Sequence, residues 1–102
     1  MNKLYIDTRD NNRIVVRLEA NGKIFEEESK ASELRAQMTL PLIEKALARA
    51  RIAPSSIDEI NVEEQAGSFT GIRVGVAIAN ALAFSLGIAV NGKKQIVTPI
   101  YE

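Results

Sequence analysis

Residues 67–86 read GSFTGIRVGVAIANALAFSL, and Arg73 is the only charged residue among them. Apolar side chains recur at helical spacing on almost every side of this stretch, which predicts a helix that is apolar around most of its girth. Either Ser68 or Thr70 can cap its amino terminus. The helix is expected to end before Gly87, because glycine suits the left-handed position that follows many helices.

Small side chains spaced four apart form one line along this helix: Gly71, Gly75, Ala79 and Ala83. Small residues let a second backbone come close. A helix that is apolar on most sides must be covered on more than one side, and the domain's own sheet can cover only one. We therefore expect an uncovered face of this helix to be a protein interface. The alternative is that both helices of the domain pack together on one sheet face and leave nothing for a partner.

The chain has 102 residues, with 13 Lys plus Arg, 13 Asp plus Glu, and neither His nor Cys. A chain of this length holds one hydrophobic core, so we expect a single domain. Without Cys and His there can be no thiolate nucleophile, disulfide or Cys/His zinc site, and we expect neither a metal nor a cofactor. Lack of His also removes the most common general base, which argues against catalysis by this chain alone. Zero net charge argues against a domain that coats nucleic acid.

No segment of the sequence is expected to target or span a membrane. The amino terminus becomes charged before an apolar region of signal-peptide length can form. Residues 74–90 lack charge and approach the length of a spanning helix, but Gly75, Asn80, Ser85 and Gly87 interrupt them. We therefore expect a cytoplasmic protein.

The first part of the chain predicts three strands, at residues 4–7, 14–19 and 23–28. The second and third are expected to form an antiparallel hairpin, because Asn21 and Gly22 between them tolerate the positive φ angles of a type I′ turn.

A helix is predicted over residues 32–51, where apolar residues recur at three- and four-residue steps. Pro41 should kink it, unless the helix is really two pieces. A fourth strand is predicted at residues 57–64, and residues 88–90 with 95–98 could supply a last one. The order βββαβαβ indicates an α/β fold, with a mixed sheet that has an antiparallel edge.

The nine residues from Gly67 to Gly75 resemble the signature G-S-F-T-G-[LI]-R-[IV]-G of the TsaB family, also called YeaZ. Members of this family are bacterial subunits of the machinery that places a threonylcarbamoyl group on an adenosine of tRNA. Residues 5–8 are similar to the family's opening A-I-D-T, and Ser32-Glu33 with residues 40–43 is similar to its first helix. Gln65-Ala66 departs from the usual Gly-Pro, which affects the expected shape of this loop.

The resemblance implies the first ribonuclease-H-like half of the actin-like ATPase superfamily. Residues 1–102 would then be the amino-terminal domain of a TsaB-like protein, without the family's second domain. It implies a non-catalytic subunit for the threonylcarbamoyladenosine modification of tRNA, which pairs through its two helices with itself or with a TsaD-like catalytic subunit. A TsaE-like ATPase is a further candidate partner, and tRNA would be contacted only indirectly.

The expected interface combines the resemblance with the apolar helix. Arg73 in it is either a solvated cation or a bidentate partner for a carboxylate of the paired subunit. The full expected set is Leu34, Met38, Leu42, Gly67, Ser68, Phe69, Thr70, Gly71, Ile72, Arg73, Gly75, Val76, Ala79 and Ala83.

Asp7, Thr8 and Arg9 support a different hypothesis, because the turn after the first strand approaches a nucleotide phosphate in actin-like folds. Asp7 could orient a magnesium-bound water, and Thr8 could donate to phosphate. The chain would then be a nucleotide-binding enzyme of the actin-like ATPase type. The structural alternative is an Asx turn between two strands.

A third hypothesis is a freestanding homodimer outside the tRNA pathway.

Overall fold

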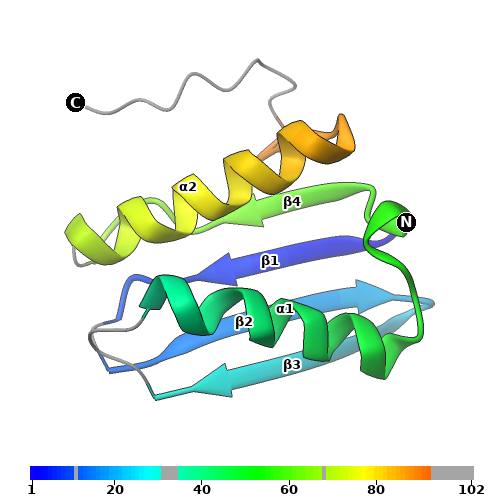
Figure 1. Cartoon of the computed structure of the whole chain (residues 1–102), viewed down its shortest axis with the longest axis horizontal. Coiled ribbons are helices and arrows are strands. Elements are labelled where there is room, and N and C mark those ends of the chain that lie inside the picture. The colour runs from blue at the N-terminus through cyan, green and yellow to red at the C-terminus, as the bar shows by residue number, and fades with distance from the viewer. Residues whose placement is uncertain (11, 31–34, 68, 93–102) are drawn as a thin grey trace.

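The computed structural model describes residues 1–10, 12–30, 35–67 and 69–92. Within these ranges the elements follow the predicted order βββαβαβ (Figure 1). The strands are β1 (Lys3–Asp7), β2 (Ile14–Ala20), β3 (Lys23–Ser29), β4 (Glu59–Val62) and β5 (Ala89–Val90). The helices are α1 (Arg35–Ala50), a short 3-10 turn at Pro54–Ser56, and α2 (Phe69–Leu86).

The strands form one mixed sheet in the order β3-β2-β1-β4-β5. β1 pairs antiparallel with β2, and β2 with β3, whereas β1 pairs parallel with β4 and β4 with β5. Both helices cover the same face of the sheet, α1 over β2 and β3 and α2 over β4 (Figure 1). This arrangement confirms the predicted α/β class with an antiparallel edge, as expected for a ribonuclease-H-like or actin-like domain.

The two faces of the sheet differ because side chains alternate along each strand. The helix-facing residues Leu4, Ile6, Val16, Leu18 and Ile60 are fully or almost fully buried and form the core with α1 and α2. The other face is polar and carries cross-strand ion pairs between Arg17 and Glu26 at 2.9 Å and between Lys3 and Glu59 at 3.4 Å.

Backbone conformations at two turns explain where elements end. Asn21 and Gly22 both have positive φ, at 55° and 73°, which confirms the predicted hairpin turn. Gly87 has φ 69°, and the amides of Gly87 and Ile88 donate to the carbonyls of Phe84 and Ala83. These are the bonds of a Schellman motif, so the predicted end of α2 is confirmed.

Several predicted boundaries differ from the structure. β4 ends at Val62, so the expected strand over residues 57–64 is too long by several residues. Thr70 lies inside α2 and does not cap it, while Ser68 and residues 95–98 lie outside the described residues. α1 runs without interruption through Pro41, which excludes two separate helices.

By length and composition, α2 would be able to cross a membrane. Core helices of soluble proteins pass the same test, so it carries little weight. In the structure α2 packs along β4 and also contacts β1 and β5.

Candidate functional site

The line of small residues on α2 faces the domain's own sheet. Gly71, Gly75, Ala79 and Ala83 are the buried residues of this helix. A Cβ atom added at Gly75 would overlap Oγ1 of Thr8 and lie 3.3 Å from Cγ2 of Val62. The prediction that this line contacts a partner is therefore wrong for these four residues, because they are buried in the domain itself, and at Gly75 the close approach is to Thr8 and Val62.

Thr8 follows directly after β1 and locks α2 in this position. Its side chain is fully buried, and its hydroxyl donates a hydrogen bond to the carbonyl oxygen of Gly71 at 2.5 Å. The hydroxyl hydrogen is therefore committed inside the fold, which argues against donation from Thr8 to a phosphate.

Asp7 and Arg9 form a bidentate ion pair beside it. Nε and Nη2 of Arg9 each donate to a carboxylate oxygen of Asp7 at 3.0 Å, and the Arg9 backbone amide donates to the same carboxylate at 3.0 Å. The last bond is an Asx turn, which confirms the structural alternative for this segment. Burial acts to raise the pKa of the Asp7 carboxyl, but hydrogen bonds from Arg9 outweigh it and the pKa is lowered. The negative charge of the ionised Asp7 carboxylate is thus already compensated by Arg9.

The remaining donors of Arg9 reach the loop after β4. Nη1 donates to the carbonyl oxygen of Gln65 at 3.1 Å and lies 3.6 Å from a carboxylate oxygen of Glu63. The other oxygen of Glu63 accepts a hydrogen bond from the Tyr5 hydroxyl at 3.0 Å. Burial, followed by this hydrogen bond, raises the pKa of Tyr5 to about 12, so the phenol stays protonated at neutral pH.

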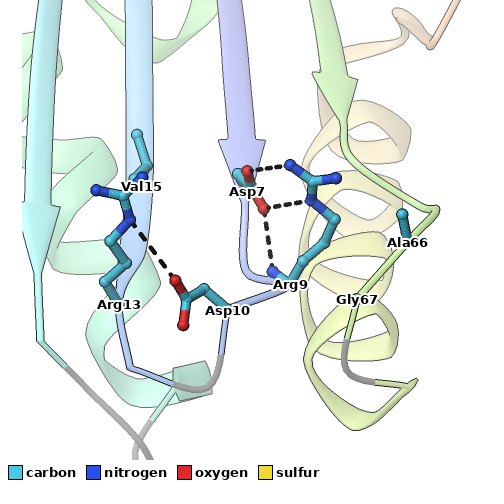
Figure 2. A pocket seen from close by; sticks show the side chains of 7 residues that line it. All are labelled: Asp7, Arg9, Asp10, Arg13, Val15, Ala66 and Gly67. Carbon is cyan, nitrogen blue, oxygen red and sulfur yellow. Dashed lines mark hydrogen bonds and ion pairs between the residues drawn. The ribbon is translucent and has the colours of Figure 1, made fainter.

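A cavity of about 300 Å³ opens at this end of the sheet, where β1 and β4 finish (Figure 2). The charged residues that line it are paired within the protein. Nε of Arg13 lies 3.8 Å from Oδ2 of Asp10, and Nη1 of Arg13 lies 3.2 Å from Oε2 of Glu28. Among the described residues, no group of three acidic side chains could hold a metal ion. The lining residues are Asp7, Arg9, Asp10, Arg13, Val15, Ala66 and Gly67.

The side of α2 opposite the small-residue line is exposed and largely apolar. We call it the outer face of α2 and define it by Phe69, Arg73, Ala77, Ala81 and Phe84. The two phenylalanines are 64% and 75% exposed. The guanidinium of Arg73 lies over the ring of Phe69, 5.3 Å from its centroid. Arginine and aromatic residues are enriched in protein interfaces, so this face has the composition of a docking surface.

Only part of the expected interface set lies at this surface. Phe69, Thr70 and Arg73 are exposed, and Ile72 and Val76 are half-buried.

The other members of the set lie elsewhere. Leu42 is buried in the core, so the prediction that it contacts a partner is wrong. Met38 is half-buried and packs against the core. Gly67 is exposed and lies against Arg9. Leu34 and Ser68 lie outside the residues whose side chains are described.

Sequence reasoning missed Ala77, Ala81 and Phe84. Helical spacing places them opposite the buried line, so they could have been found if that line had been assigned to the sheet rather than to a partner.

Comparisons with known proteins find a match to a TsaD family model and relatives named TsaB or YeaZ. Residues 25–95 match the model of the family described as TsaD, tRNA N6-adenosine threonylcarbamoyltransferase. The tRNA threonylcarbamoyladenosine biosynthesis protein TsaB of Bacillus subtilis is 29% identical over 98 residues, which cover 96% of this chain and 43% of that protein. TsaB of Haemophilus influenzae is 35% identical over 60 residues, which cover 59% of this chain and 25% of that protein.

Solved structures give the same result. YeaZ from Pseudomonas aeruginosa superimposes with a TM-score of 0.82 at 30% identity, covering 87% of this chain and 41% of that chain. A second structure, described as an uncharacterized protein with similarity to peptidase YEAZ from Pseudomonas aeruginosa, gives a TM-score of 0.83 with the same identity and coverage. The chain therefore spans less than half the length of these relatives.

Proposed function

Because the chain belongs to the TsaB/YeaZ family and also matches the TsaD family model, we propose that it is a non-catalytic partner subunit in the biosynthesis of threonylcarbamoyladenosine in tRNA. It would act in the cytoplasm and reach tRNA only through its partner. Residues 1–102 would correspond to the amino-terminal domain of the longer relatives.

The outer face of α2 is the observation that carries this proposal. Contiguous exposed apolar surface on a small domain commonly marks an association site. Phe69 and Phe84 stand at its two ends, and the small side chains of Ala77 and Ala81 lie between them. A partner helix could therefore approach the α2 backbone at the alanines while the rings cover its flanks.

The proposed occupant of this face is a TsaD-type protein or a second copy of the chain. Arg73 would then contribute its charge at the interface, where a carboxylate of the partner could accept from it. A TsaE-like ATPase would join this assembly as a further partner.

The non-catalytic part of the proposal is supported by the residues at the carboxyl end of β1. Asp7 is held by Arg9, and the Thr8 hydroxyl is held by Gly71. The groups that a nucleotide and magnesium would need are thus already bonded within the protein. Calorimetric binding of ATP with magnesium that is lost in Asp7→Ala would favour a nucleotide-binding enzyme instead.

Calorimetric titration with a TsaD-type protein tests the proposed interface. Ala77→Glu places a charge in the middle of the outer face, and we expect affinity to fall by at least about tenfold because a carboxylate buried without a partner is costly. The matched control is Ile24→Glu, which changes an exposed apolar residue on β3, on the face of the sheet away from the helices. Equal affinities for both variants and the unaltered chain would contradict the proposal.

A further inference from the structure

The side chain of Arg9 connects two segments that are far apart in the sequence. It is fixed at one end by the bidentate pair with Asp7, where β1 finishes. From there it extends toward the loop that carries Ala66 and Gly67 (Figure 2). The bond from Nη1 to the Gln65 carbonyl fastens that loop to the end of β1.

Gly67 shows how closely the loop lies on the stem of Arg9. A Cβ atom added at Gly67 would overlap Cβ of Arg9 and would lie 3.2 Å from its Cα. Only a residue without a side chain allows this approach, because other residues would push the loop away. Arg9 therefore holds the loop both through its guanidinium and through its stem.

The neighbouring Thr8 holds the first turn of α2 in the same way, through its bond to Gly71. The outer face of α2 begins in this turn with Phe69 and continues in the next turn with Arg73. The hydrogen-bonding and ionic partners of Arg9 are Asp7 and the segment after β4, not the exposed residues of α2.

We infer that Arg9 is a positioning residue for partner binding, which holds the loop before α2 so that the first part of the outer face is ordered before a partner arrives. This inference rests on the proposed function, since it concerns the same face of α2. A segment that is already ordered loses less conformational entropy on association, so it binds more tightly through unchanged contacts. Loss of Arg9 would loosen the segment and leave the contacting side chains in place.

Amide hydrogen exchange of the full chain tests the ordering step without any partner. We expect Arg9→Ala to speed exchange at residues 73–76, in the first hydrogen-bonded turn of α2, by about tenfold. Arg9→Lys should give an intermediate increase, because a lysine keeps the charge but cannot form the two-pronged bond to Asp7 and still reach Gln65. Arg13→Ala is the matched control, since Arg13 lines the same cavity but pairs with Asp10 and Glu28.

The same experiment separates positioning from a general loss of stability. In Arg9→Ala the amides of residues 15–19 in the interior strand β2 should exchange at the rate of the unaltered chain. An equal increase in β2 and α2 would show that Arg9 acts on the whole fold, and that result would overturn the inference.

The second measurement is the affinity for a TsaD-type protein or for a second copy. We expect Arg9→Ala to weaken binding by about tenfold and Arg13→Ala to leave it unchanged. Unchanged exchange at residues 73–76, or faster exchange with unchanged affinity, would overturn the inference. An unaltered chain that binds neither protein would contradict the proposed function, and the exchange data would still decide whether Arg9 orders this end of α2.

Discussion

Gly75 of α2 lies against Thr8, just after β1, and this contact leaves no room for a side chain. Gly75→Ala should lower the free energy of unfolding by about 1–3 kcal/mol, because the new methyl group must displace the buried Thr8 hydroxyl. Denaturant unfolding measures the loss. Ala77→Leu adds more atoms to the exposed side of the same helix and should change stability by less than about 0.5 kcal/mol. Similar losses in both variants would contradict the assignment of the small-residue line to the sheet.

Arg51 ends α1 in the same left-handed conformation that Gly87 provides for α2. Its φ is 58°, and the amides of Arg51 and Ile52 donate to the carbonyls of Ala48 and Leu47. A side chain at this position strains the backbone, which glycine would relieve.

Arg51→Gly should therefore stabilise the protein by about 1 kcal/mol, measured as a rise in the thermal midpoint. Ala48→Gly, on the exposed side of α1, should do the reverse and cost about 1 kcal/mol. If Arg51→Gly destabilised the protein as Ala48→Gly does, the described helix end would be wrong.

The sequence indicates at residue level which glycines are special, but not what they contact. Gly67 and Gly75 stand in a recognisable motif, and close helix packing is the correct physical explanation for Gly75, whereas Gly67 lies in the loop before α2, against the stem of Arg9. Their neighbours, Arg9 and Thr8, lie 58 and 67 residues away in the chain. Only the folded sheet brings these residues together, so the motif and the turn after β1 are predicted as two separate sites although they are one.

At the level of elements, a buried carboxylate joins α1 to the edge strand β3. Glu27 is 8% exposed, accepts a hydrogen bond from Nη1 of Arg49, and lies 3.6 Å from Nζ of Lys45. The hydrogen bond from Arg49 holds the pKa of the Glu27 carboxyl below its ordinary value.

This lowered pKa has a definite effect on acid stability. The ionised Glu27 stabilises the fold above the pKa of about 4.5 that it has in the unfolded chain, and this contribution is lost as the pH falls through the lower folded-state pKa. Glu27→Gln should therefore reduce stability near neutral pH and flatten its decline below about pH 4.5. Urea unfolding at several pH values measures this slope. Glu44→Gln on the exposed side of α1 is the control, and an unchanged slope in Glu27→Gln would refute the described contact.

The elements themselves are largely predictable, because their patterns are local. Alternating residues, the Asn21-Gly22 turn and the two helical repeats suffice for their order. Strand ends are less predictable, since the alternation of residues 57–64 continues beyond the four residues that pair in β4. The length of a strand depends on its neighbour, and that information is not local.

For the whole molecule, a mixed sheet with an antiparallel edge follows from the element order, whereas the location of the interface does not. The apolar girth of α2 predicts more burial than one sheet can provide. It does not say which side the sheet takes, and the small residues suggest the wrong one. The structure leaves the side with Phe69, Ala77 and Phe84 exposed, and our proposal moves the interface there.

Sedimentation velocity of the full chain, alone and mixed with a TsaD-type protein, tests the central claim most directly. The proposal predicts a species with the mass of a homodimer or of a one-to-one complex, which Ala77→Glu dissociates and Ile24→Glu preserves. A chain that sediments as an 11.2 kDa monomer in both samples would contradict it.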